Sequence, residues 1–145
     1  MIFFKEKKAD RNIIIIGCGR LGSKIANTLS DKGESVLVID KNRDSYRRLS
    51  PGFGGLTIVG DGTDMATLEE AQIQDASVVV AVTNDDSINI MVSQLAKNIY
   101  HTDRVIARLY DPERSCSCEG LDIDIICPAS LSAREIDNLL ETSDN

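Results

Sequence analysis

The sequence has no long hydrophobic run, and none of its apolar stretches approaches the ~20 residues of a membrane-spanning helix. Its N-terminus also lacks the apolar stretch and the small-residue cleavage site of a secretory signal peptide. We therefore expect a cytoplasmic protein without direct membrane insertion, in which the four cysteines are reduced thiols.

Basic charge is scarce as well. The chain carries 16 Lys and Arg residues against 23 Asp and Glu residues, which gives a formal net charge of -7. An acidic surface repels the phosphate backbone of DNA and RNA. No nucleic acid is therefore expected as a partner.

Side chains suited to catalysis or to metal binding are few. The only histidine, His101, precedes a predicted strand and so lies at the edge of the sheet away from bound ligands. Cys116 and Cys118 do not form a C-x-x-C pair, and no second pair of ligands has zinc spacing. We expect no metal site and no catalytic histidine.

The chain is also short. Its 145 residues suit one domain, with no internal linker or low-complexity stretch. An enzyme that uses a dinucleotide normally combines a cofactor domain with a substrate domain, and there is room here for one of them. We expect an N-terminal extension over residues 1–11, a single domain over residues 12–141 and a frayed tail over residues 142–145.

What the sequence does contain is an alternation of short apolar runs with longer stretches of helical spacing. Several runs are apolar throughout, which is typical of strands buried on both faces of a parallel sheet. The predicted strands cover residues 12–16, 35–39, 56–59, 77–82, 104–109 and 123–126. This order predicts an α/β fold, a Rossmann-type doubly wound sheet of six parallel strands in a three-layer arrangement.

The stretches between these runs predict helices. They cover residues 20–31, a segment that ends before Pro51, a short stretch around 65–73, residues 85–100, and a weaker crossover around 112–119. In the stretch over 85–100 the apolar stripe consists of Ile88, Met91, Val92, Leu95 and Ile99. A final helix is predicted to begin near 130–132, because Ser132 and Glu135 have the spacing of a capping box.

A glycine-rich loop follows the first predicted strand directly. Its sequence, Gly17-Cys18-Gly19-Arg20-Leu21-Gly22, fits G-x-G-x-x-G and opens a helix, as phosphate binding requires. The first glycine allows a tight turn, the second lets a pyrophosphate approach the backbone, and the third brings the helix close to the sheet. Arg20 opposes the helix dipole unless a phosphate is bound, and the alternative is a solvated surface arginine.

Asp40 ends the second predicted strand and supports a nucleotide site. A carboxylate at this position accepts hydrogen bonds from both ribose hydroxyls and repels a 2′-phosphate, which favours NAD or an adenine nucleotide over NADP. The neighbouring Lys41 softens that exclusion. The alternative is a tight strand–helix turn in which Asp40 is a solvated cap.

Polar residues follow three further strands at the same edge of the sheet, where ligands bind in this class of fold. Those after the third strand, which suit an adenine edge, are Asp61, Gly62 and Thr63. Those after the fourth strand are Thr83, Asn84 and Asp85, and Arg108 lies near the end of the fifth. Turns and helix caps are the alternative interpretation, and Asp64 is better explained as a cap.

Taken together, Gly-Cys-Gly-Arg-Leu-Gly, Val-Ile-Asp40, Gly60-Asp61-Gly62-Thr63-Asp64, Val82-Thr83-Asn84-Asp85-Asp86 and Ile106-Ala-Arg108 resemble the TrkA-N family over about residues 11–141. These RCK or KTN domains regulate potassium transporters and channels. The resemblance implies a Rossmann domain that binds NAD(H), ATP, ADP or AMP. It also implies a homo-oligomer, either a dimer or a ring, or a hetero-ring with a related subunit.

By position, the resemblance assigns the phosphates to Gly17, Gly19, Arg20 and Gly22, and the ribose to Asp40 with Lys41 beside it. Asp61 and Thr63 would flank the adenine. Thr83, Asn84 and Asp85 would line the rest of the cleft, and Arg108 would face phosphates or a dimer partner. Many family members carry a second, C-terminal ligand-binding domain, which we do not expect within this chain.

The function expected is therefore that of a non-catalytic, nucleotide-sensing regulatory subunit at the inner face of the membrane, bound to a membrane potassium transporter subunit. The alternative is the cofactor-binding domain of a small NAD-dependent oxidoreductase. That alternative requires a proton donor at the ligand edge, where no His, Lys or Tyr stands out. A third possibility is a structural partner with a vestigial site.

Overall fold

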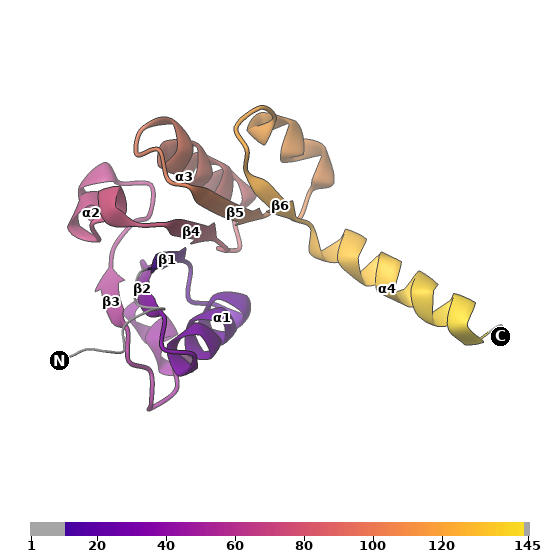
Figure 1. The fold of residues 1–145 in the computed structure, drawn as a ribbon, viewed down its shortest axis with the longest axis horizontal. Coiled ribbons are helices and arrows are strands. Elements are labelled where there is room, and N and C mark those ends of the chain that lie inside the picture. The colour runs from indigo at the N-terminus through magenta and orange to yellow at the C-terminus, as the bar shows by residue number, and fades with distance from the viewer. Residues whose placement is uncertain (1–10, 144–145) are drawn as a thin grey trace.

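A computed structural model describes residues 11–143, and its sheet confirms the predicted fold. Six parallel strands lie in the order β3-β2-β1-β4-β5-β6 (Figure 1). Their bounds are β1 (Asn12–Ile16), β2 (Ser35–Asp40), β3 (Leu56–Val59), β4 (Val78–Ala81), β5 (Arg104–Arg108) and β6 (Asp124–Ile126). This is the strand order of a doubly wound Rossmann sheet.

Helical segments connect the strands. The α-helices are α1 (Arg20–Asp31), α2 (Met65–Glu70), α3 (Asp86–Asn98) and α4 (Pro128–Ser143). The 3-10 segments are η2 (Arg43–Arg48), η3 (Ile73–Asp75) and η4 (Pro112–Cys118). No helix within residues 11–143 is long and apolar enough to cross a bilayer.

The core lies on both faces of the central strands. Ile13 to Ile16 of β1 are all at most 4% exposed, which explains the unbroken run of isoleucines. On one face, Ile15 and Val80 pack beneath Ala26 of α1. On the other, Ile14 and Val79 belong to the cluster that contains residues of α2 and α3. Each face of the sheet therefore has its own layer, which gives the three-layer arrangement.

The chain leaves β1 and β4 toward opposite edges of the sheet. β2 and β3 follow on one side of β1, whereas β5 and β6 follow on the other side of β4. The carboxyl ends of the two central strands therefore lie at the topological switch point, where the two halves of an α/β sheet leave a crevice. Gly17 and Thr83, which follow these strands, stand on its two sides.

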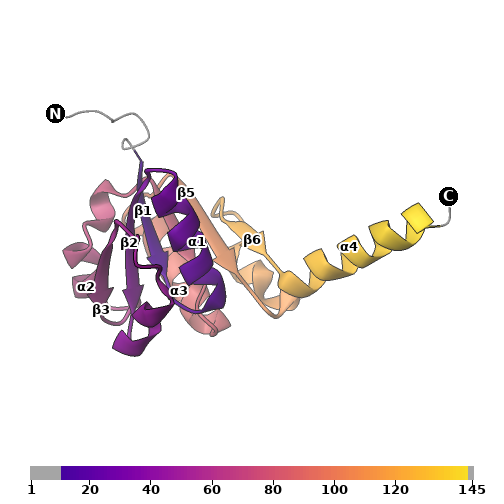
Figure 2. The ribbon, with the colours of Figure 1, turned by 90° about the horizontal axis from the view of Figure 1, so that it is seen from below.

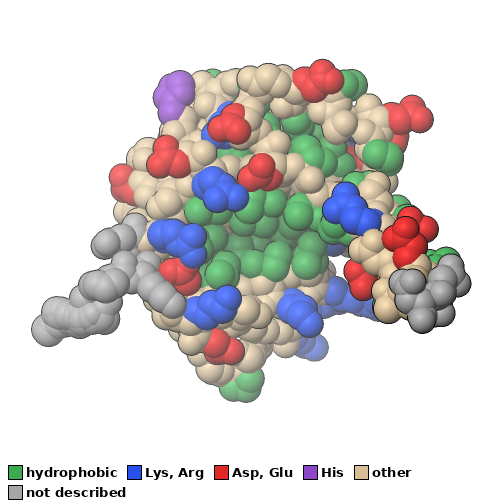
Figure 3. All heavy atoms as spheres, turned by 45° about the vertical axis from the view of Figure 1, so that its right-hand side comes forward, with side chains coloured by type: hydrophobic (Ala, Val, Ile, Leu, Met, Phe, Trp, Pro, Cys, Tyr) green, Lys and Arg blue, Asp and Glu red, His purple; other side chains and the backbone are tan. Residues whose placement is uncertain are grey.

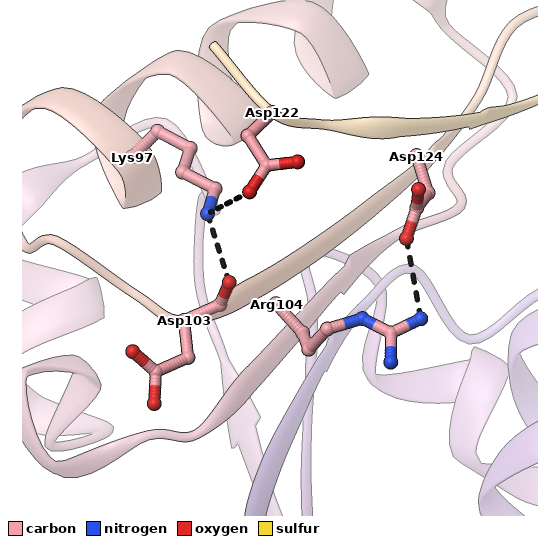
Figure 4. A network of polar contacts seen from close by, with 5 residues as sticks. All are labelled: Lys97, Asp103, Arg104, Asp122 and Asp124. Atoms are coloured by element: carbon pink, nitrogen blue, oxygen red, sulfur yellow. Dashed lines mark hydrogen bonds and ion pairs between the residues drawn. The ribbon is translucent and has the colours of Figure 1, made fainter.

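Ion pairs join the elements at the amino ends of β5 and β6, the end of the sheet away from the switch point. Lys97 of α3 donates to the backbone oxygen of Asp103 at 2.8 Å and pairs with Asp122 at 3.9 Å (Figure 4). Arg104 of β5 pairs with Asp124 of β6 at 3.2 Å, as Figure 4 also shows. These contacts join α3, β5 and β6 on the side away from the switch point.

The stripe predicted for α3 is partly wrong. Met91 and Ile99 are about half exposed, whereas Asn89, Ser93 and Ala96 are fully buried. Small and polar residues face the sheet here because they let the helix pack closely and because Asn89 bonds to the strand ends. The predicted stripe was therefore rotated away from the buried face.

The final helix also differs from expectation. It begins at Pro128, so Ser132 lies inside it and the predicted capping box is wrong. Proline is favoured in the first turn of a helix, where its missing N–H costs nothing. The helix continues through Ser143, so the expected frayed tail is helical at 142–143, and 144–145 lie outside the described residues, as do residues 1–10 of the expected extension. Figures 1 and 2 show α4 projecting away from the sheet.

Candidate nucleotide-binding cleft

The glycine loop makes a turn that no larger residue could copy. Gly17 has a φ of +108°, and a Cβ there would lie 2.9 Å from the Thr83 backbone nitrogen. A Cβ on Gly22 would lie 1.9 Å from the Gly17 oxygen. By contrast, a Cβ on Gly19 would meet no atom within 4 Å. The loop is thus packed on its inner side and open at Gly19, as a phosphate-binding loop must be.

The helix that follows the loop begins without a cap. Gly19 is the N-cap of α1, no side chain among residues 11–143 caps the first N–H groups of the helix, and its first turn contains no acidic residue. Backbone N–H groups and the positive end of the helix dipole therefore face the open side of the loop. Arg20, the first residue of α1, is exposed and adds a positive charge.

Cys18 points inward from this loop. Its thiol is fully buried and donates to the Ser45 oxygen at 3.5 Å, which attaches η2 to the loop. Burial, and next the negative charge of Asp40, raise the pKa of the Cys18 thiol to about 11. A thiol with this pKa stays protonated near neutral pH and is a poor nucleophile.

Asp40 connects the end of β2 to the glycine loop. Its Oδ2 accepts from the Cys18 backbone nitrogen at 2.7 Å, and its Oδ1 accepts from the Asn42 nitrogen at 2.8 Å. Each carboxylate oxygen has a further lone pair. The carboxylate can therefore hold the loop and still accept from ribose hydroxyls.

Asp61 and Thr63 form a closed turn after β3. The Oδ1 atom of Asp61 accepts from the Thr63 backbone nitrogen at 2.9 Å and from the Thr63 hydroxyl at 2.7 Å. These hydrogen bonds lower the pKa of Asp61 from its ordinary value. Asp64, as predicted, caps α2 by accepting from the Ala66 nitrogen at 2.9 Å.

The side chain of Asn89 fixes the end of β4, a role that was not predicted from the sequence. Its Oδ1 accepts from the backbone nitrogen and the hydroxyl of Thr83, and its Nδ2 donates to the oxygens of Thr83 and Arg108. Asp85 caps α3 by accepting from the Ser87 nitrogen at 2.8 Å. The strand ends of β4 and β5 are thereby fixed to one helix.

Arg108 is almost fully buried at the end of β5. Its Nη2 donates to the oxygens of Val82 and Thr83, each at 3.0 Å, and to Oδ1 of Asn84 at 3.2 Å. Its guanidinium carbon lies 5.0 Å from the centre of the Tyr110 ring, which is the geometry of a cation–π contact. Nε is buried and has no hydrogen-bond partner among the described residues.

Three adjoining cavities follow the carboxyl edge of the sheet. The first compartment, of about 130 Å³, and the second, of about 350 Å³, share the lining residues Gly17, Asp40 and Thr83. The second compartment and the third, of about 390 Å³, share Gly19, Arg48 and Asn84. They therefore form one elongated cleft. A further cavity of about 350 Å³ lies at the amino ends of β1 and β2 and contains no predicted site residue.

Most of the predicted site residues line this cleft. The structure brings together Gly17, Gly19, Arg20, Asp40, Lys41, Asp61, Gly62, Thr83, Asn84 and Arg108. The others do not line it but hold the residues that do: Cys18, Leu21, Gly22, Thr63 and Asp85. Arg48 and Tyr110, which the sequence argument missed, line the third compartment.

The family comparison agrees with this cleft. The model of the TrkA-N domain family matches residues 13–128, which is most of the chain. The chain belongs to the TrkA-N family. Two curated relatives are a Trk system potassium uptake protein TrkA of Streptomyces coelicolor, 38% identical over 86% of this chain, and a TrkA homolog of Pyrococcus horikoshii, 34% identical over 90%. This TrkA-N chain spans 56% and 60% of their lengths.

Solved structures show the same TrkA-N architecture. The GsuK channel bound to NAD has a TM-score of 0.77 and 30% identity, covering 99% of this chain and 25% of that one. GsuK bound to ADP has a TM-score of 0.75 and 31% identity, covering 94% of this chain and 35% of that one. The fold predicted from the sequence is thus confirmed both by the strand order and by these neighbours.

Proposed function

We propose that this TrkA-N domain binds NAD(H) or an adenine nucleotide and regulates a potassium transporter or channel without catalysing a reaction. The observation that carries the proposal is the continuous cleft at the switch point, with the uncapped end of α1 facing it and Asp40 lining two of its compartments. Relatives named for potassium uptake and GsuK structures bound to NAD and ADP support it.

The cleft suits a ligand with an adenosine end and phosphates. Gly62 and Ile88 line the narrow first compartment together with Asp40, which is the place for a ribose. The second compartment continues past Gly19 to the first turn of α1, where backbone N–H groups meet phosphates. Because the carboxylate of Asp40 would repel a 2′-phosphate, NADP is disfavoured.

Several features argue against a catalytic role. His101 lies before β5, at the edge opposite the cleft, and the high pKa of Cys18 makes it a poor nucleophile. Of the cleft-lining residues that could donate a proton, Lys41 and Tyr110 are exposed. The carboxylates of Asp40 and Asp61 accept hydrogen bonds within their own turns. An oxidoreductase would need a donor held beside the substrate.

Calorimetry with NADH, ATP, ADP and AMP tests the proposed binding, and a failure to bind any of them would refute it. Turnover in an NADH oxidation assay with simple carbonyl substrates would instead support the oxidoreductase alternative. Copurification with a membrane potassium transporter subunit tests the proposed location at the inner face of the membrane, since peripheral attachment needs such a partner.

We also propose that the domain assembles with a second copy through α4. Leu131, Ile136 and Leu139 of this helix are between 46% and 61% exposed. On the α1 face of the sheet, Ile106 is only partly buried and Ile126 is 39% exposed, because the crossovers through α3 and η4 pack on the other face. Apolar surfaces of this kind normally mark interfaces.

Charge and shape favour the packing of α4 from a second copy on this apolar face. Figure 3 shows a hydrophobic hollow whose border carries several Lys and Arg side chains and fewer Asp and Glu side chains. Helix α4 carries one arginine, Arg134, against Glu135, Asp137 and Glu141. An acidic helix with an apolar side complements a basic rim around an apolar hollow.

Light scattering tests this assembly. Leu139→Asp would bury a charge in the interface, so the measured molar mass should fall to that of a monomer. Asn138→Asp is the control, because it adds the same charge on another side of the helix and should not change the molar mass. A wild-type monomer at all concentrations, or an equal effect of the two substitutions, would refute assembly through this face.

A further inference from the structure

The cavity at the amino ends of β1 and β2, here called the amino-end cavity, has no part in the proposed nucleotide binding. Its volume of about 350 Å³ falls in the range of roughly 300–1,000 Å³ that is usual for binding sites. Its lining residues come from the starts of β1, β2 and β3 and from the segment between α2 and β4. It shares no lining residue with the three compartments of the cleft, so its occupant is not the nucleotide held there.

The amino-end cavity is acidic. Its lining contains Glu34 and Asp75 but no Lys or Arg. The side chain of Glu34 is only 4% exposed and pairs with Arg11. Asp75 is exposed, and over residues 11–143 its carboxylate takes part in no ion pair. Carboxylates attract positive charge and repel negative charge, so the cavity suits a cationic occupant.

The same cavity also has an apolar side. Ile14, Leu37 and Ala71 line it and belong to, or pack against, the core cluster on the α2 side of the sheet. Leu56 of β3 lines it as well, and this side chain is 68% exposed. A large apolar side chain stays in contact with water unless another apolar group covers it. The occupant therefore needs apolar side chains as well as positive charge.

The first described residues of the chain are attached to this cavity. Arg11 donates a hydrogen bond to the buried carboxylate of Glu34. The Nδ2 atom of Asn12 donates to the backbone oxygen of Asp75 at 3.2 Å, and the Asn12 backbone nitrogen donates to the Ser77 hydroxyl, also at 3.2 Å. These contacts join the start of β1 both to the start of β2 and to η3. The residues before Arg11 therefore begin at the rim of the cavity.

We infer that residues 2–8 of this chain bind in the amino-end cavity. Their sequence, Ile-Phe-Phe-Lys-Glu-Lys-Lys, combines three adjoining apolar residues with three lysines and one acid. The apolar residues cover Leu56, and the lysines lie beside the carboxylate of Asp75. Phe4 precedes Asn12 by eight residues, which span up to ~26 Å when extended, enough to reach across a cavity of this volume.

Other occupants fit the amino-end cavity less well. A nucleotide brings phosphates, which the two carboxylates repel. Helix α4 of a second copy brings apolar residues, but its three acids against one arginine give it the same sign of charge as the lining. Residues 2–8 have the opposite sign and start at the rim, so their binding closes only a short loop, at a small cost in entropy.

Photo-cross-linking on the full chain tests the inference. With p-benzoylphenylalanine in place of Phe4, irradiation should give a product with the mass of one chain, and peptide mapping should find the link at residues 54–56 or 71–76. Asp75→Lys should lower the yield ~5-fold, because it replaces an attraction for the lysines by a repulsion. Asp31→Lys is the matched control, because Asp31 is exposed at the end of α1 and does not line the cavity. It should leave the yield unchanged.

Several results would overturn the inference. These are links confined to other parts of the chain, links to a second copy, an equal loss of yield in both charge variants, and no link from position 4 or from the same probe at Phe3. The carboxylate of Asp75 accepts no hydrogen bond among residues 11–143, so Asp75→Lys should keep the fold, which circular dichroism checks. Each of these results leaves the proposed nucleotide binding intact, because the cleft and the cavity have no residue in common.

Discussion

Asn89→Leu should destabilise the protein strongly, although the leucine side chain branches at the same carbon as that of asparagine. The side chain of Asn89 is fully buried and makes four hydrogen bonds, three of them with Thr83 and one with Arg108. The substitution removes both the acceptor and the donor, so the Thr83 nitrogen and the Arg108 oxygen lose their side-chain partner. The Thr83 oxygen keeps its hydrogen bond from Arg108, and the Thr83 hydroxyl can rotate toward Asp85, so two backbone groups carry the loss.

The magnitude follows from these two groups. At ~1–3 kcal/mol for each buried group left unsatisfied, the free energy of unfolding should fall by ~2–6 kcal/mol. That is a large part of the ~5–15 kcal/mol typical of a domain, so the variant should fold but be marginally stable. With an m-value of ~2 kcal/mol/M in urea, the unfolding midpoint should shift by ~2 M.

Urea unfolding followed by circular dichroism measures this shift. Asn98→Leu is the control, because Asn98 is exposed at the other end of the same helix. A midpoint within ~0.5 M of wild type in Asn89→Leu would refute the reasoning, since it would mean that the strand ends find other partners at no cost.

Three further predictions follow from the site. Asp40→Asn should weaken every ribose-bearing ligand by ~10-fold or more in calorimetry, because an amide cannot accept from two hydroxyls while also facing the Cys18 amide. The pKa of Asp61 is lower in the folded protein than its ordinary value of about 3.9, so the ionised carboxylate stabilises the fold above that value. This stability is lost as the pH falls through the pKa of the folded state. Asp61→Asn should therefore make the free energy of unfolding depend less on pH at the acid end. Iodoacetamide with peptide mapping should modify Cys127, whose pKa is lowered by hydrogen bonds from Ser130, well before Cys18. Faster labelling of Cys18, an unchanged acid limb or unaltered ligand affinity would contradict the respective prediction.

The fold could be predicted almost completely because its signals are local and strong. Ile13 to Ile16 and Val78 to Val82 are apolar without interruption, and only a sheet covered on both faces buries such runs. The glycine loop was equally readable, since the positive φ of Gly17 and the tight packing of Gly22 leave no choice of residue. These features depend on residues that are close together in the sequence.

The parts of the site that were missed depend on contacts between distant segments. Asn89 looks like an ordinary helix residue until the helix is docked on the ends of β4 and β5. Arg48 lies in a 3-10 segment, which has no strong periodicity, so the sequence does not distinguish it from Arg47. A polar residue at a position that faces the sheet was the one available signal for Asn89, and the apolar stripe assigned to α3 obscured it.

The cleft and the first residues of α4 lie at the same end of the sheet. A ligand in the cleft can therefore move that helix if it binds one position of the helix more tightly than another. The Tyr110 oxygen accepts from the Cys127 thiol at 3.9 Å, and Cys127 directly precedes α4. A ligand shifts such an element only by its differential affinity for two arrangements. One charge-assisted hydrogen bond, at ~1.5–3 kcal/mol, corresponds to ~10- to ~150-fold, whereas a change from 1:99 to 99:1 needs ~10⁴-fold. A single hydrogen bond is therefore insufficient, and a nucleotide that switches the domain must make several such bonds, to residues such as Arg20, Arg48 and Arg108, in only one of the two arrangements.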